Sequence, residues 1–230
     1  MKLYIGNKNY SSWSMRPWVM LKNAGIAFDE VKLRFDSFDK DSTFRSAIEK
    51  ISPVGKVPVL IDGSLTVWDT LAIAEYAAES YPEKQLWPQE KAHRARARSI
   101  CAEMHSGFTP LRGACMMNIE ANLPEVGALI LRDKPAVVAD VNRIEMIWSE
   151  LLDANGGPFL FGANFTIADA YFAPVCMRFK TYALSTKPQI NAYIEAIRHA
   201  PGVKEWIEDA LAEDDFRDFE EPYRLLRPAV

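Results

Sequence analysis

Up to about residue 80, short apolar runs that fit β-strands alternate with longer runs that fit helices. Residues 3–5 form an apolar run before a polar loop, and residues 28–33 alternate in polarity, so both segments are predicted to be strands. Residues 57–61 and 64–68 are two β-rich runs on either side of Asp62-Gly63, which is the pattern of a β-hairpin.

Helices are predicted between these strands. One begins near Ser14, has Pro17 in its first turn and ends at Gly25. A weaker helical stretch covers about 42–50, and a third helix follows the hairpin over about 70–80. This order, βαβ followed by αββα, predicts a small mixed sheet with flanking helices.

The strand pattern ends at residues 83–90, which are predicted to be a linker. Beyond them, apolar residues recur at helical spacing, for example at positions 141, 144, 148 and 151 and at positions 190, 193, 194 and 197. We therefore expect an α/β domain over residues 1–82 and an all-helical domain over residues 91–230.

The composition is that of a globular protein, with 230 residues, 49% hydrophobic and 25% charged, and a formal net charge of −4. This acidic balance does not favour binding to nucleic acid. The N-terminus reaches a turn too early for a secretory signal, and no apolar run is long enough to span a membrane, so we expect a cytoplasmic protein. The widely spaced Cys101, Cys115 and Cys176 are expected to be free buried thiols, and no metal site is predicted.

A serine-rich loop, Asn9-Tyr10-Ser11-Ser12-Trp13-Ser14-Met15-Arg16, leads from the first strand into a helix N-terminus. Free N–H groups and the positive end of the helix dipole favour an anion there, and a serine hydroxyl could donate a hydrogen bond to a bound thiolate. The simpler alternative is that one serine caps the helix and the others fill the turn. The loop alone leaves both interpretations open.

Two further segments also allow a structural and a functional interpretation. Pro58 lies in a β-rich run, where it has no backbone N–H to donate to a sheet. One possibility is that the Val57–Pro58 bond is cis, which frees the Val57 backbone to bind an extended peptide. The other is that the run is an edge strand with a trans proline. Asp69 and Thr70 begin the helix after the hairpin. Asp69 is either a simple N-cap, or the two residues together bind the ammonium and carboxylate groups of a ligand.

In their order and spacing, these segments resemble the motifs of the glutathione transferase superfamily. Residues 11–16 are similar to the serine motif S-S-C-S-x-R of zeta-like and other serine-type transferases, residues 55–60 to the cis-proline segment, and residues 69–73 to the E/D-S-x-A-I motif. In the helical part, Thr166 and Asp169 match the buried S/T-x-x-D capping box. The resemblance covers both domains and implies a thioredoxin-like domain followed by a helical domain, usually in a homodimer.

The resemblance also implies that glutathione is the co-substrate and which residues bind it. Ser11 would be the thiolate partner, with Ser12 and Tyr10 as alternatives. The peptide itself would be held by side chains and backbone of the first domain: Trp13, Lys56, Val57, Pro58, Asp69 and Thr70. A small, largely apolar electrophile would lie against the second domain, where the helical candidates are Met104, His105, Phe108 and Arg112.

Trp13 stands where the zeta-like motif has a cysteine, and the first domain contains no cysteine at all. A mechanism that uses a protein thiol therefore has no nucleophile in this domain, and the indole would line the site in place of a small thiol. The expected activity is attack of the glutathione thiolate on an electrophile, with peroxide reduction or isomerisation by the same thiolate as further options. The alternative is a non-catalytic interaction module with the same fold.

Overall fold

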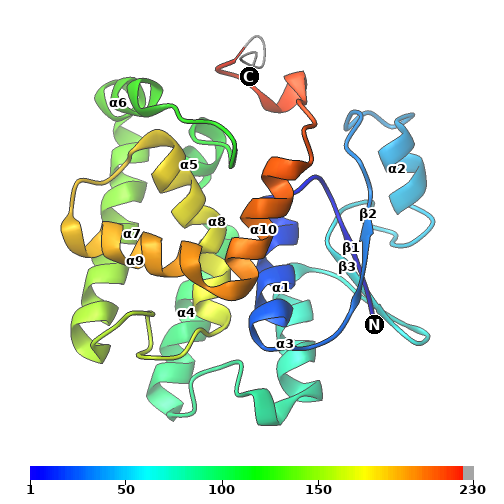
Figure 1. Cartoon of the computed structure of the whole chain (residues 1–230), viewed down its shortest axis with the longest axis horizontal. Helices are drawn as coiled ribbons and strands as arrows, with labels where there is room; N and C mark the ends of the chain where they lie inside the picture. Colours follow the sequence, from blue (N-terminus) through cyan, green and yellow to red (C-terminus); the bar gives the residue numbers. More distant parts are fainter. Residues whose placement is uncertain (225–230) are drawn as a thin grey trace.

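A computed structural model of the chain describes residues 1–224, in which a four-stranded sheet with its helices adjoins a larger helical bundle (Figure 1). The sheet order is β2-β1-β3-β4. β1 (Lys2–Ile5) pairs in parallel with β2 (Asp29–Lys32) and antiparallel with β3 (Val59–Asp62), which forms a hairpin with β4 (Leu65–Val67). The predicted mixed sheet and hairpin are therefore confirmed.

The two faces of the sheet bury different residues, because successive side chains of a strand point to opposite sides. Leu3, Ile5 and Leu60 belong to the main core, together with α1 (Ser12–Asn23) and α3 (Thr70–Ser80). Tyr4 and Val59 pack on the other face in a smaller cluster with Phe35 and with side chains of α2 (Thr43–Ile48). Figure 1 accordingly shows α2 across the sheet from α1.

The second domain consists of helices surrounding one buried helix. α8 (Ile167–Tyr182) is buried along nearly its whole length, and the T-x-x-D capping box at its start is present as predicted. The other helices of this domain are α4 (Lys91–Ser106), α5 (Thr109–Ala114), α6 (Pro124–Asp133), α7 (Pro135–Asn155), α9 (Pro188–His199) and α10 (Pro201–Ala212). Short 3₁₀ turns lie at Pro82–Lys84 and Asp218–Glu220.

One continuous core joins the two domains. α1 packs against α8 and α10 of the helical domain as well as against α3 and the sheet of its own domain. The N-terminus of α1, which carries the serine-rich loop, therefore lies at the boundary between the domains. α1 begins at Ser12, two positions before the predicted start, and the chain turns at Gly25, which has a positive φ of 65°.

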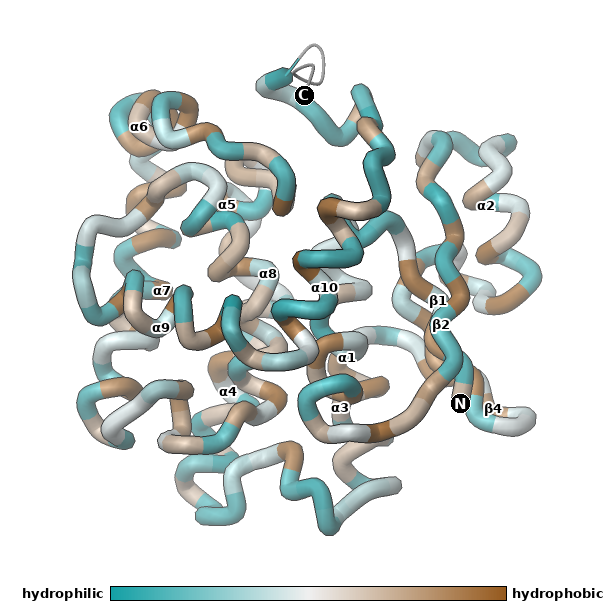
Figure 2. Tube along the Cα trace, viewed as in Figure 1, coloured by the Kyte–Doolittle hydropathy of each residue, from teal (hydrophilic) through white to brown (hydrophobic). Residues whose placement is uncertain are grey.

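The chain leaves α10 and returns across the first domain. This returning segment, residues 213–224, is called the C-terminal strap below; apart from its 3₁₀ turn it is irregular and, as Figure 2 shows, mostly hydrophilic. Cys101, Cys115 and Cys176 are free and buried. Within residues 1–224, no helix is long and apolar enough to cross a membrane, and no three His, Cys, Asp or Glu side chains are grouped as metal ligands.

Candidate active site

Two adjoining cavities lie at the N-terminus of α1. The serine cavity, of about 410 Å³, is bounded by the serine-rich loop, by aromatic side chains of the first domain, by the helical domain and by the C-terminal strap. The α3 cavity, of about 370 Å³, extends from the loop to the start of α3. Both are lined by Trp13, Lys56, Val57 and Arg112, so they form one groove.

The two adjacent serines of the loop have different hydrogen bonds, although both line the serine cavity. The Ser11 Oγ lies 2.7 Å from the Ser14 Oγ, which also accepts the Gly6 N–H at 3.1 Å. Ser11 occupies the N-cap position of α1, but its side chain makes no capping bond. The Ser12 Oγ accepts a hydrogen bond from Nη2 of Arg178 at 3.2 Å, which leaves the Ser12 hydroxyl proton available to a ligand.

The start of α1 also offers backbone donors. Within the described part of the chain, the N–H groups of Trp13 and Ser14 have no acceptor. Unpaired N–H groups and the helix dipole together favour a negative charge at this position. The Ser11 side chain therefore does not cap α1, and a role of the loop in binding an anion stays a prediction.

Three guanidinium groups surround Ser12 and Trp13. Arg16 donates to the Ser12 carbonyl at 3.0 Å, and the guanidinium carbons of Arg16 and Arg112 lie 4.3 and 4.9 Å from the Trp13 ring centroid. Arg178 is buried and donates to the carbonyls of Arg112 and Cys115. Across residues 1–224, none of these three arginines pairs with a carboxylate.

Burial and mutual repulsion act on these charges. Loss of solvation lowers the pKa of Arg16 to about 9 and that of Arg178 to about 10, and it also lowers the pKa of Arg112. The neighbouring guanidiniums contribute to the lowering at Arg16 and Arg178. All three remain protonated near neutral pH, so this part of the groove has positive charge that a bound anion would neutralise.

Tyr10, the third candidate of the loop, is turned toward the C-terminal strap. Its hydroxyl donates to Oε1 of Glu221 at 2.8 Å and accepts the Arg217 N–H at 3.2 Å. Burial, the largest cause, raises the pKa of Tyr10 well above its ordinary value. The phenol proton is thus engaged, although the Tyr10 side chain contributes to the cavity wall.

The Val57–Pro58 bond is cis. Within residues 1–224, neither the N–H nor the C=O of Val57 has a hydrogen-bonding partner, and Val57 lines both cavities. This is the backbone arrangement in which an extended peptide can pair with Val57 as an added strand. Lys56, beside it, is exposed and also lines both cavities.

Asp69 and Thr70 lie at the far end of the groove. Asp69 is the N-cap of α3, where one carboxylate oxygen accepts the Leu71 N–H at 2.9 Å, and the other lies 3.4 Å from Nε2 of His105. Asp69 is exposed, Thr70 is buried, and both line the α3 cavity. Asp69 therefore caps α3, and its carboxylate also lies where a ligand ammonium can reach it.

The structure separates the four electrophile candidates of the helical domain. Met104, on the inward face of α4, and Phe108, at the N-cap of α5, are buried in the main core and line neither cavity. His105 lines the α3 cavity only, with its ring 5.1 Å from that of Trp13. Arg112 is the one of the four that lines the serine cavity.

Several residues of the serine cavity were not predicted from the sequence: Phe35, Phe38, Phe44, Arg45, Met116, Met117, Arg178 and Glu220. Arg178 had one signal, since it is a charged residue in an otherwise apolar helical stretch from Val175 to Phe179. Glu220 had none, because it lies in a short 3₁₀ turn of a polar segment for which the sequence predicted no element.

Comparison with known proteins fits this geometry. Residues 10–80 match the family model of the glutathione S-transferase N-terminal domain, and residues 92–209 match that of the C-terminal domain. The chain belongs to the glutathione S-transferase family. It is 28% identical over 201 residues to a probable maleylacetoacetate isomerase of Caenorhabditis elegans, covering 86% of this chain and 89% of the relative.

Two solved structures share the fold. A glutathione transferase homologue from Burkholderia with bound glutathione is 24% identical, with a TM-score of 0.68 over 92% of this chain and 98% of that one. A maleyl pyruvate isomerase, described as a bacterial glutathione S-transferase of the zeta class, is 22% identical, with a TM-score of 0.68 over 94% of this chain and all of the other. The predicted thioredoxin-like domain followed by a helical domain is thereby confirmed.

Proposed function

We propose that this protein binds glutathione in the groove and activates its thiol at the serine-rich loop for attack on a small electrophile that has an apolar body and an anionic group. The observation that carries the proposal is the Ser12 hydroxyl, which accepts a hydrogen bond from Arg178 and lies among three arginines without carboxylate partners. A hydroxyl held in this way can donate its proton to an anion, and the surrounding charges favour that anion.

The peptide part of glutathione fits the α3 cavity. Its cysteine would pair with the free backbone groups of Val57, its γ-glutamyl end would reach Asp69 and Thr70, and its glycine carboxylate would meet Lys56. This places the sulfur beside Trp13, near the junction with the serine cavity. Asp69 can serve the ligand and α3 together, because it uses one oxygen for the cap.

The energy required for thiol activation is modest. A thiol with a pKa near 8.5 needs a shift of about two units, or roughly 2.7 kcal/mol, to be mostly thiolate at neutral pH. A hydrogen bond to a charged group supplies about 1.5–3 kcal/mol, and a helix N-terminus adds about 0.3–1 kcal/mol. One serine hydroxyl at the start of α1 is therefore sufficient. Ser12 is the better donor, since Ser11 is engaged with Ser14.

The second substrate would occupy the serine cavity. Phe35, Phe38 and Phe44 supply apolar surface, and Arg112 and Arg178 supply positive charge. The sequence predicted a largely apolar electrophile. Because Arg178, which was not predicted to lie here, also lines this cavity, we propose that the electrophile carries an anionic group as well. Relatives named maleylacetoacetate isomerase and maleyl pyruvate isomerase support isomerisation of a double bond next to a carboxylate, by reversible addition of the thiolate, beside simple conjugation.

The proposal includes a homodimer, which the family resemblance implies, and the cytoplasmic location that is expected from the sequence. A test begins with calorimetric titration of glutathione, followed by the ultraviolet absorbance of the bound thiolate as a function of pH. Conjugation is then measured with 1-chloro-2,4-dinitrobenzene and with its carboxylated analogue, 4-chloro-3,5-dinitrobenzoate. The expected result is binding, thiolate at neutral pH and a preference for the carboxylated compound. Binding without thiolate and without turnover would favour a non-catalytic module instead.

A further inference from the structure

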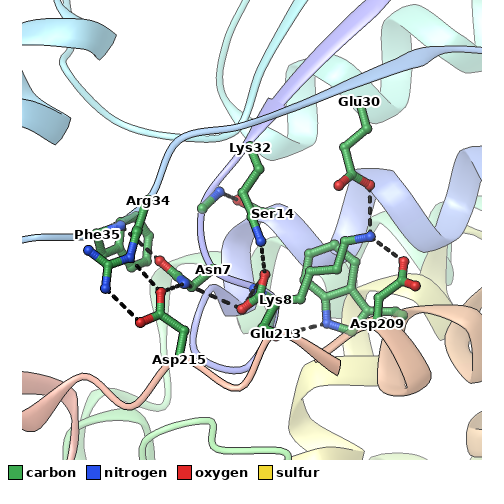
Figure 3. A network of polar contacts seen from close by, with 12 residues as sticks. Asn7, Lys8, Ser14, Glu30, Lys32, Arg34, Phe35, Asp209, Glu213 and Asp215 are labelled. Atoms are coloured by element: carbon green, nitrogen blue, oxygen red, sulfur yellow. Dashed lines mark hydrogen bonds and ion pairs between the residues drawn. The ribbon is translucent and has the colours of Figure 1, made fainter. Parts of the chain in front are cut away.

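The C-terminal strap is fixed to the first domain by a polar network (Figure 3). Nδ2 of Asn7 donates to Asp215 at 2.9 Å, and the Lys8 N–H donates to Glu213 at 2.9 Å. Arg34 holds Asp215 through two hydrogen bonds of 2.8 Å. These bonds attach the start of the strap to the strand end from which the serine-rich loop begins.

The other end of the strap is attached to both domains. Glu221 accepts hydrogen bonds from the Tyr10 hydroxyl and from Nδ2 of Asn118, each at 2.8 Å. The Tyr223 hydroxyl donates to the Ala114 carbonyl at 2.7 Å. The strap therefore crosses the boundary between the domains beside the serine cavity, with a fixed path at both ends.

Between these attachments, Glu220 lines the serine cavity, as Arg178 does. The residue is only 8% exposed, yet within residues 1–224 its carboxyl group makes no hydrogen bond and no ion pair. Glu213, Asp215 and Glu221 of the same strap are all paired with neighbouring elements. The Glu220 carboxyl group is therefore not held by a hydrogen bond, so Glu220 differs from the acids that attach the strap.

The charged surroundings of Glu220 are predominantly positive. Two of the cations that line the cavity come from the helical domain, Arg178 from α8 and Arg112 from α5. The other two, Arg45 and Lys56, come from the first domain. Arg45 is paired with Glu49. On the strap itself, the charge of Glu221 acts on Glu220. Among the described residues that line the serine cavity, Glu220 is the one acid.

We propose that Glu220 is a specificity-determining residue of the serine cavity, whose charge decides how strongly the cavity accepts an anionic electrophile beside Arg178. The inference rests on the proposed function, since it concerns the second substrate of the same site. When Glu220 is neutral, the arginines are uncompensated and an anion is favoured. When Glu220 is ionised, it offsets one positive charge and repels the anion.

Both states are accessible near neutral pH. Burial, the largest cause, raises the pKa of Glu220 to about 7, and the neighbouring charge of Glu221 acts in the same direction, whereas Arg178 opposes them. Binding of an anion is therefore expected to weaken as the pH rises through 7. If only the protonated form accepts the anion, the dissociation constant at pH 8 is about tenfold that at pH 6.

The experiment uses unreactive probes, so it does not depend on turnover. The protein is saturated with S-methylglutathione, which has no thiol proton, and is titrated with 3,5-dinitrobenzoate and with neutral 1,3-dinitrobenzene at pH 6 and pH 8. Glu220→Gln removes the charge and keeps the shape. Asp218→Asn is the matched control, because Asp218 lies in the same 3₁₀ turn but is exposed and lines neither cavity. His105, which lines the α3 cavity, is unchanged in both variants.

The expected result is a rise of about tenfold in the dissociation constant of dinitrobenzoate between pH 6 and pH 8 in the unaltered protein and in Asp218→Asn. In Glu220→Gln the constant should stay near its pH 6 value at both pH values. Dinitrobenzene should bind equally under all conditions, which also reports that the cavity of each variant is intact. A dinitrobenzoate constant with the same pH dependence in Glu220→Gln, or no dinitrobenzoate binding at all, overturns the inference about Glu220. Failure of S-methylglutathione to bind overturns the proposed function, and the inference with it.

Discussion

Nη2 of Arg178, in the buried helix α8, donates a hydrogen bond of 3.2 Å to the hydroxyl of Ser12, although the two residues are 166 positions apart in the chain. A cation and a hydroxyl brought together in this way at a helix N-terminus provide an electrostatic site for a thiolate.

Ser12→Ala should raise the pKa of the glutathione thiol in the complex by about one to two units, because it removes the donor to the thiolate. Affinity for glutathione should change little, since the contacts of Val57 and Asp69 remain. Conjugation near neutral pH should slow by roughly ten- to a hundredfold. The measurement is thiolate absorbance against pH in the complex.

Ser11→Ala and Tyr10→Phe are the matched controls for Ser12→Ala. Ser11→Ala should have a smaller effect, because the Ser11 hydroxyl is engaged with Ser14, and Tyr10→Phe the smallest. If Ser11→Ala raises the pKa of the bound glutathione thiol and Ser12→Ala does not, Ser11 is the thiolate partner. If no variant differs and the unaltered protein forms no thiolate at neutral pH, the non-catalytic module is the better interpretation.

Asp69→Asn should weaken glutathione binding by about 1.5–3 kcal/mol while leaving the stability of α3 nearly unchanged. Asparagine caps a helix about as well as aspartate, so this change removes only the charge offered to the ligand ammonium. Asp69→Ala should weaken binding similarly and also cost about 1 kcal/mol of stability through loss of the cap. Calorimetry of binding and chemical denaturation separate the two effects. Unchanged affinity in Asp69→Asn would remove Asp69 from the glutathione site.

Asp169→Ala should destabilise the protein by about 1–3 kcal/mol without changing the chemistry. Asp169 accepts the N–H groups of Leu160 and Thr166 at 3.0 and 2.9 Å, and all of these groups are buried. Its removal leaves buried donors without acceptors. Tyr193→Phe, which removes a single donor to Asp169, is the milder control. An unchanged denaturation midpoint in Asp169→Ala would contradict this role.

The contribution of Asp169 to stability should depend on pH. Burial, the largest cause, raises its pKa from 3.8 to about 6, so the folded state binds the proton more tightly than the unfolded state. The contribution is therefore fully present below pH 3.8 and is lost as the pH rises through about 6. Relative to Asp169→Asn, the unaltered protein should lose about 2.4 kcal/mol of unfolding free energy between pH 4 and pH 7. A constant difference between the two proteins would show that the carboxyl titrates normally.

Turnover should not require a mixed disulfide between the protein and glutathione. All three cysteines are buried, and burial raises the pKa of Cys115 to about 11 and those of Cys101 and Cys176 well above the ordinary value. Such thiols are poor nucleophiles. Mass spectrometry after treatment with glutathione disulfide should find the folded protein unmodified, whereas the denatured protein should react. Stoichiometric modification that is needed for turnover would overturn this expectation.

Much of the fold and part of the groove follow from short-range patterns. Apolar alternation gives the strands, Asp62-Gly63 gives the hairpin, and the Thr166–Asp169 spacing gives the capping box, because each depends on residues a few positions apart. The positions of Val57 and Asp69 in the groove were predictable for the same reason, since each lies at the end of a locally encoded element.

The walls of the serine cavity were decided by tertiary structure alone. Met104 and Phe108 were candidates because they follow the linker in the helical part of the chain, but the packing of the helical domain buries them in the core and brings Arg178 of α8 to Ser12 instead. Glu220 reaches the same cavity because the strap returns across the first domain, fixed by Asn7 and Arg34. Short-range sequence patterns do not predict such contacts. The free energy that stabilises them comes from burying α8 against α1 and from pairing charges that lie far apart in the chain.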